Sequence, residues 1–221
     1  MIWLSRYLLI SFIYSSTNSP IYDFLPWLKD HLLARILNHP YDGGESTFLD
    51  EDQHTVTFVN NRIFKHKVPH INYTTYDMWW SQNSMNPCTH TDIMVLSCED
   101  EEDEGKWHPY WYAHVIGIFH THVQHVGPSS NCSESQRMEF LGVRWFGHNL
   151  SHRAGWKSKC LHRVGFDEQD QFGFLDPNDV IHGVRLIPTF AHGYTPDKLG
   201  SSIARQPNEN NEDWVYYYVN M

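Results

Sequence analysis

Short runs of apolar and aromatic residues, separated by long polar loops, set the pattern of this chain. Three such runs follow one another at residues 93–97, 109–119 and 142–146. Runs of this length joined by polar loops are typical of a small curled β-sheet and not of the parallel sheet of an enzyme. Further strands are predicted at residues 55–59, 62–68, 71–77, 161–166, 172–177, 180–190 and 213–220.

One segment shows helical periodicity instead. Residues 23–38 place Leu25, Leu28, Leu32 and Ile36 on one apolar stripe, with Pro26 in the first turn, where its missing N–H carries no cost. Pro40 and the glycines that follow it end the pattern. We expect this helix to pack against the sheet, with binding of a partner as the alternative.

Three connecting segments are also interpreted from their composition. Asn60-Asn61 predicts a tight hairpin turn, because asparagine tolerates positive φ. Residues 78–87, with Trp79 and Trp80, are expected to form a loop across the surface. Residues 191–213 are polar, contain several Pro and Gly, and predict a loose loop.

These elements predict a mainly β fold with a minor α component: an SH3-like β-barrel with an N-terminal amphipathic helix. The expected organisation is a helix and hairpin extension at 23–90, the barrel at 91–190, and a loop with a closing strand at 191–221. Because the chain stops directly after an apolar strand, we expect it to be a fragment of a longer protein.

Residues 1–22 stand apart from this organisation. Their apolar run is too short for a membrane-spanning helix, and we interpret them as disordered or as an artefact of gene-model translation. A signal peptide is the alternative, because glycosylation sequons begin at Asn72, Asn131 and Asn149. That alternative would make the protein secreted.

Charge and cysteine usage narrow the function classes. The net charge is −10 with histidine neutral, which argues against a general nucleic-acid coat and favours basic partners. The four cysteines lie ten or more residues apart with no CxxC pair, so a zinc knuckle is not expected and we interpret them as reduced thiols.

No catalytic signature is present. The chain lacks GxSxG, HExxH, P-loop and GxGxxG sequences, so we expect no enzyme activity and no cofactor. The nearest approach to a metal site is His120, His122 and His125, because residues i and i+2 of a strand share a face. Such a site would need a third ligand, and an exposed strand end is the preferred interpretation.

Aromatic residues beside an acidic run form the favoured partner-binding site. Trp107, Tyr110, Trp111 and Tyr112 follow the acidic residues 99–104. In a strand Tyr110 and Tyr112 face one way and Trp111 the other, so one set is expected in the core. The other set could hold a lysine or methylated lysine by cation–π contact, and plain core packing is the alternative.

A basic segment offers a different partner. No acidic residue occurs between Phe140 and Phe166, whereas this stretch holds five basic residues that could follow a phosphate backbone. A solvated loop that balances the acidic run is the alternative. The candidate nucleic-acid-binding residues are Arg144, Arg153, Lys157, Lys159 and Arg163.

The order DIMVLS, acidic loop, PYWYAHVIGIF, GVRWF and later FGFLDPNDVIHGVRLIP resembles the bromo-adjacent homology (BAH) domain over residues 92–190. The resemblance implies an SH3-like β-barrel and a chromatin-associated binding module, often for histone tails. The chain departs from the family pattern after GVRWF, where Gly147-His148-Asn149 replaces the common Tyr-Arg-Pro.

A second resemblance covers residues 25–221. The segments NNRIFKHKVPHINYTTYDM, THTDIMVLS, RWFGHNLSHRAGWKSK and VRLIPTFAHG are similar to a C-terminal region of large fungal proteins associated with Kyakuja-Dileera-Zisupton (KDZ) DNA transposons. This resemblance implies a mobile-element origin.

Together these features predict a non-catalytic binding module of a transposon-derived fungal protein, located in the nucleus, that contacts chromatin or histone tails. The alternatives are a nucleic-acid-binding accessory region of a transposase and a metal-dependent enzyme at the histidine cluster. The expected partner is a histone tail or another basic peptide, DNA is the second possibility, and no membrane contact is expected.

Overall fold

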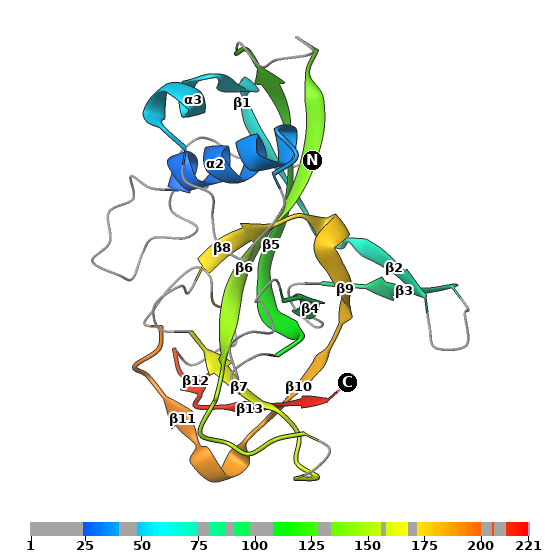
Figure 1. The fold of residues 1–221 in the computed structure, drawn as a ribbon, viewed down its shortest axis with the longest axis vertical. Helices are drawn as coiled ribbons and strands as arrows, with labels where there is room; N and C mark the ends of the chain where they lie inside the picture. The colour runs from blue at the N-terminus through cyan, green and yellow to red at the C-terminus, as the bar shows by residue number, and fades with distance from the viewer. Residues whose placement is uncertain are drawn as a thin grey trace.

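A computed structural model shows a mainly β protein with short helices, as the sequence pattern predicts (Figure 1). The predicted segment 1–22 and the acidic run 99–104 lie outside the described residues. The structure describes residues 24–39, 48–74, 80–86, 91–97, 108–127, 134–155, 158–167, 172–199, 205 and 211–220.

Two long antiparallel strands, β5 (Tyr110–His125) and β6 (Gln136–His148), form the axis of the main sheet (Figure 1). The two halves of each strand pair with different neighbouring strands. β4 and β1 pair with the two halves of β5, and β7 and β8 pair with the two halves of β6. These neighbours are β1 (Val56–His66), β4 (Asp92–Leu96), β7 (Arg163–Phe166) and β8 (Phe172–Leu175).

The sheet curls, and its first and last strands are neighbours in the sequence. Its strand order is β10-β13-β7-β6-β5-β4-β9, so the end strands are β9 (Val180–Gly183) and β10 (Arg185–Pro188), which Val184 alone separates. β13 (Tyr217–Asn220) lies between β7 and β10. In the described part of the chain no ladder joins the two end strands, so the sheet is not a closed barrel. Strands from all three predicted regions, 23–90, 91–190 and 191–221, share this one sheet.

The predicted helix forms as α2 (Phe24–Ile36) and packs on the sheet. Its apolar stripe, with Leu28 and Leu32 fully buried, contacts Phe119, Phe140 and other side chains of β1, β5, β6 and β8. Figure 1 shows α2 lying across the half of the sheet that also carries β1. Burial of this stripe is the main source of the helix's stability, because a helix of this length is marginal alone.

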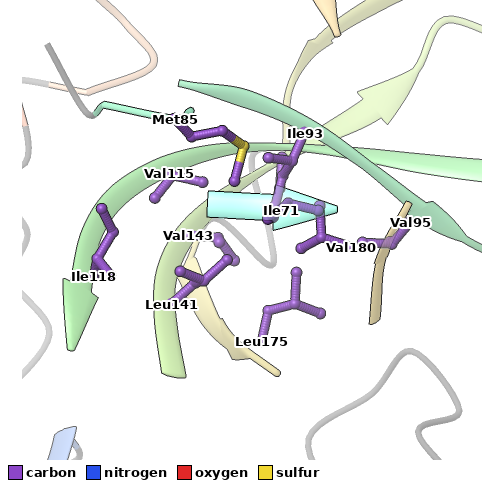
Figure 2. Close-up of a cluster of buried hydrophobic side chains, with 11 residues drawn as sticks. Ile71, Met85, Ile93, Val95, Val115, Ile118, Leu141, Val143, Leu175 and Val180 are labelled. Atoms are coloured by element: carbon purple, nitrogen blue, oxygen red, sulfur yellow. The ribbon is translucent and has the colours of Figure 1, made fainter. Parts of the chain in front are cut away.

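A bulge in β5 divides the core. The register with β6 shifts between Val115 and Gly117, which inserts one extra residue and reverses the alternation of faces. Val115 and Ile118 therefore point into the same cluster although three positions separate them. Figure 2 shows this cluster, in which Ile71 of β2 (His70–Thr74) lies among side chains from strands of the main sheet.

The prediction of a hairpin at Asn60-Asn61 is wrong. Both asparagines do adopt positive φ, 57° and 51°, but β1 continues through them and pairs with β5 on both sides. The register jumps from Phe58 opposite Val123 to Ile63 opposite Thr121, so the asparagines bulge out of one strand. Positive φ therefore serves a bulge here and not a chain reversal.

The predicted loop at 78–87 is also wrong in part. β3 (Trp80–Ser84) pairs with β2 (His70–Thr74) in a two-stranded hairpin. Trp79 lies outside the described residues. The polar sequence of β3 hides this strand, because only one face of the hairpin contacts the core, through Ile71 and the following Met85.

Short elements complete the fold. The predicted loop 191–213 contains one half of a small ladder, in which β11 pairs with β12. Among the described residues no helix is long and apolar enough to span a membrane. The remaining elements are α3 (Asp50–His54), η1 (Pro177–Asp179), η2 (Phe190–His192), β11 (Tyr194–Thr195) and β12 (Asp213–Trp214).

Candidate functional site

A cavity of about 380 Å³ opens where the curled sheet meets the β11–β12 ladder. Its volume falls in the range of small-ligand sites, roughly 300–1,000 Å³. Five aromatic side chains wall it, and we call it the aromatic cavity. These side chains are Phe146, Phe166, Tyr194, Trp214 and Tyr217.

The base of the aromatic cavity is a buried cluster of three charges. Asp213 accepts two hydrogen bonds from Arg144, at 3.1 and 3.0 Å, and two from Arg205, both at 3.0 Å. Burial lowers the pKa of Arg144, and the hydrogen bonds and charge of Asp213 oppose that effect. The Arg144 guanidinium also lies over the Phe166 ring, 3.6 Å from its centroid. These contacts leave both guanidiniums committed to the protein.

Arg205 also fixes the chain around the cavity. Its guanidinium donates hydrogen bonds to the carbonyl oxygen of Leu199 and to that of Glu212, the second at 3.3 Å. These bonds hold residue 199 and the start of β12 against the sheet. The cavity wall therefore depends on an ion-paired arginine and not on a ladder alone.

One wall of the cavity carries a carboxylate–imidazole pair. Nδ1 of His114 lies 2.8 Å from Oδ1 of Asp92, and Oγ1 of Thr91 lies 3.1 Å from the same nitrogen. β4 and β5 bring these side chains together, since Asp92 and His114 are directly opposite in the ladder. The carboxylate of Asp92 accepts the Nδ1 proton of a neutral ring, and it would form an ion pair with a protonated one.

The rim of the cavity is aromatic and open to solvent. Tyr194 packs on Trp214 with ring centroids 3.8 Å apart, and Phe190 meets the edge of Trp214 at 5.2 Å. Tyr194 is 57% exposed and Phe190 is 74% exposed. The exposed rings of Tyr194 and Phe190, beside the exposed residue Glu212, form a surface suited to a cationic group.

The aromatic residues predicted to bind a partner lie elsewhere. Tyr112 is fully buried in the core and Tyr110 packs beside it, whereas Trp111 packs on the opposite face against Trp145. The predicted alternation of faces is therefore present, but both faces contact core clusters. Tyr112 is not available to a partner, and Trp107 lies outside the described residues.

The predicted basic strip is divided by the fold. Arg144 is 4% exposed and belongs to the buried charge cluster, so it does not present its charge to a phosphate backbone. Arg153 and Lys159 are exposed. Arg163 lies over the Tyr216 ring, with its Cζ 4.5 Å from the ring centroid, and its Nη1 lies 3.2 Å from Nε2 of His192. Lys157 lies outside the described residues.

The histidines considered for a metal site are close in space but do not converge. The His120 ring stacks on Phe64, and its Nδ1 lies 2.5 Å from Nε2 of His66. Ring centroids of His120 and His122 are 5.7 Å apart, and His125 ends β5. In the described ranges no group of three or more His, Cys, Asp or Glu side chains could hold a metal. Cys160 is a free thiol, and the other cysteines lie outside those ranges.

A second group of imidazoles lies behind Tyr112. The ring of His108 is 4.1 Å from that of His148 and 4.3 Å from that of His162, measured between centroids. Burial, followed by the neighbouring His148, lowers the pKa of His108 to about 4. His108 is buried, whereas His148 and His162 are half-buried.

Sequence reasoning missed the aromatic cavity because its walls come from seven separate strands. The available signal was the juxtaposition of Glu212, Asp213 and Trp214, an acidic pair next to an aromatic residue. Comparisons of the chain with protein-family models, curated proteins and solved structures find no match.

Proposed function

We propose that this chain is a non-catalytic binding module that holds a basic peptide at the aromatic cavity. The observation that carries the proposal is the aromatic rim of exposed Tyr194 and half-buried Trp214 beside Asp92 and Glu212, two carboxylates that no arginine of the described residues pairs with. Aromatic faces and carboxylates together attract a cationic side chain. The net charge of −10 favours the same class of partner at long range.

The wider setting that we propose follows the two family resemblances. A BAH-like, SH3-like core in a transposon-derived fungal protein would act in the nucleus, and its basic peptide would be a histone tail. The comparison with a small barrel is supported by the curled sheet, whose end strands β9 and β10 follow one another in the chain with only Val184 between them. In this proposal the aromatic cavity replaces Trp107, Tyr110, Trp111 and Tyr112 as the binding site.

The test is equilibrium binding of fluorescent peptides to the full chain. A lysine-rich histone-tail peptide should bind, whereas an acidic peptide of equal length should not. Tyr194→Ala should weaken binding by about tenfold or more, because a central aromatic contact is worth roughly 2 kcal/mol. Trp27→Ala is the matched control, since this exposed ring lies on α2, away from the cavity. Equal binding by both variants would refute the proposed site.

Nucleic-acid contact is the second candidate function. Arg153 and Lys159 are exposed in the connection between β6 and β7, which lacks acidic residues. Duplex DNA is therefore the competing ligand in the same assay. A salt-dependent affinity for DNA that the double change of Arg153→Ala and Lys159→Ala removes would favour this candidate.

A further inference from the structure

The hydrogen bonds of His114 define its tautomer. Asp92 accepts at Oδ1 and cannot donate as a carboxylate, so the proton of a neutral His114 ring resides on Nδ1. Thr91 contributes its hydroxyl 3.1 Å from Nδ1 and 3.4 Å from Oδ1 of Asp92. Nε2 is consequently a hydrogen-bond acceptor, and among the described residues no hydrogen bond engages it.

The ring is placed to use this acceptor. His114 lines the aromatic cavity, its side chain is one-fifth exposed, and its ring meets the edge of Phe166 at 6.1 Å. An acceptor of this kind on a cavity wall is a point of selection, because a ligand without a donor leaves it unpaired.

From this geometry we infer that His114 is the specificity-determining residue of the aromatic cavity: its Nε2 accepts a hydrogen bond from a lysine ε-ammonium of the bound peptide. Protonation of the imidazole therefore weakens binding. The inference rests on the proposed function and names the ligand group and the condition under which the cavity takes it.

The arrangement of acceptors favours lysine over arginine. An ammonium is a compact charge with three rotatable donors, which one imidazole nitrogen and a nearby aromatic face can satisfy. A guanidinium needs two coplanar acceptors, and Oδ1 of Asp92 is already engaged by His114. The cavity also contains the guanidinium of Arg144 on the face of Phe166, where a ligand guanidinium would otherwise stack.

Protonation of His114 changes both parts of this recognition. The ring loses its acceptor and gains a positive charge beside the ammonium. The charged groups around it are Asp92 on β4, Arg144 on β6, Asp213 on β12, and Arg205 and Glu212 on the flanking segments. The two arginines share the carboxylate of Asp213, and Asp92 in contact with Nδ1 offsets the charge of a protonated ring. The loss of the acceptor at Nε2 is therefore the main effect of protonation on the bound ammonium.

The experiment compares a Gly-Lys repeat peptide with a Gly-Arg repeat of equal length, using the full chain at pH 8 and pH 5.5. Lysine remains charged at both values, so its own titration does not contribute. The natural chain should prefer the lysine peptide at pH 8 and lose about tenfold in affinity at pH 5.5. Circular dichroism at both values verifies that the protein stays folded.

Two variants separate the effect of protonation from the effect of losing the acceptor. His114→Gln keeps an acceptor that never ionises, so it should bind the lysine peptide at both pH values. His114→Phe removes the acceptor and should weaken binding about tenfold at pH 8. No binding of either peptide by the natural chain at pH 8 would refute the proposed function itself. Binding at pH 8 with equal affinity at pH 5.5, equal affinity for the arginine peptide, or a pH dependence that survives in His114→Gln would refute only the role of His114.

Discussion

Arg144 and Asp213 form a buried bidentate ion pair, with Nη1–Oδ1 at 3.1 Å and Nη2–Oδ2 at 3.0 Å, across 69 positions of the chain. The pair joins β6 to β12, and Arg205 adds a second guanidinium to the same carboxylate. A charge buried without its partner costs several kcal/mol, so this contact also ties the closing segment of the chain to the sheet.

Asp213→Asn should therefore destabilise the fold strongly. The change leaves two buried guanidiniums facing a neutral amide, and we expect a loss of about 3–5 kcal/mol in the free energy of unfolding, measured with urea. Glu139→Gln is the matched control, because the Arg137–Glu139 pair is about half exposed and worth about 1 kcal/mol or less. Equal losses in the two variants would contradict the structural role of the buried pair.

Acid should destabilise the protein as the pH falls from 6.5 toward 4. Burial lowers the pKa of His108 to about 4, from an unfolded value near 6.5, so the unfolded chain binds the extra proton between these values. The contribution of neutral His108 is complete above pH 6.5 and is lost as the pH falls toward 4. Urea midpoints measured from pH 7.5 to pH 4.5 should decline through this window.

His108→Gln tests the origin of that decline. Glutamine stays neutral, so the variant should show a shallower loss between pH 6.5 and pH 4.5, whatever its stability at pH 7.5. His182→Gln is a control on a half-buried histidine away from the cluster. An unchanged slope in His108→Gln would assign the acid sensitivity to other groups, of which His31 is the first, because burial lowers its pKa to about 3.

The packing of α2 on the sheet is a third testable feature. Leu28 of α2 is fully buried in a cluster with Phe140 and Phe174. Leu28→Ala should lower the free energy of unfolding by about 2–5 kcal/mol, because apolar burial is lost and a cavity forms. Trp27, one position away, is 42% exposed, and Trp27→Ala should cost about 0.5 kcal/mol or less. Thermal unfolding of both variants checks the difference, and a reversed order would place the wrong face of α2 on the sheet.

Local pattern was sufficient to predict the elements that carry their own periodicity. The stripe through Leu28 and Leu32 predicted α2, and the run 109–119 predicted most of β5. Positive φ at Asn60 and Asn61 was also predictable, but pairing of β1 with β5 on both sides depends on contacts with a distant strand. The strand Trp80–Ser84 escaped prediction because a polar hairpin lacks the alternation that marks a buried strand.

The candidate site was less predictable than the fold. The sequence pattern predicts a surface cation at Arg144, because its partner Asp213 lies in a distant acidic stretch and no local rule connects the two. Tyr112 and Tyr194 are both tyrosines near strands, yet one is buried and the other is exposed. Tyr112 lies in the main sheet and faces a core cluster, whereas Tyr194 lies in the separate β11–β12 ladder, and no local pattern reveals these pairings.

The position of β13 also links the folding of the cavity to the last described segment of the chain. β7 and β10 do not pair with each other; each pairs with β13, the last described strand along the chain. Contacts between residues far apart in sequence form slowly, because a long loop must close before they stabilise anything. The aromatic cavity, whose base needs Asp213 and whose wall needs Tyr217, is therefore incomplete until β12 and β13 are in place.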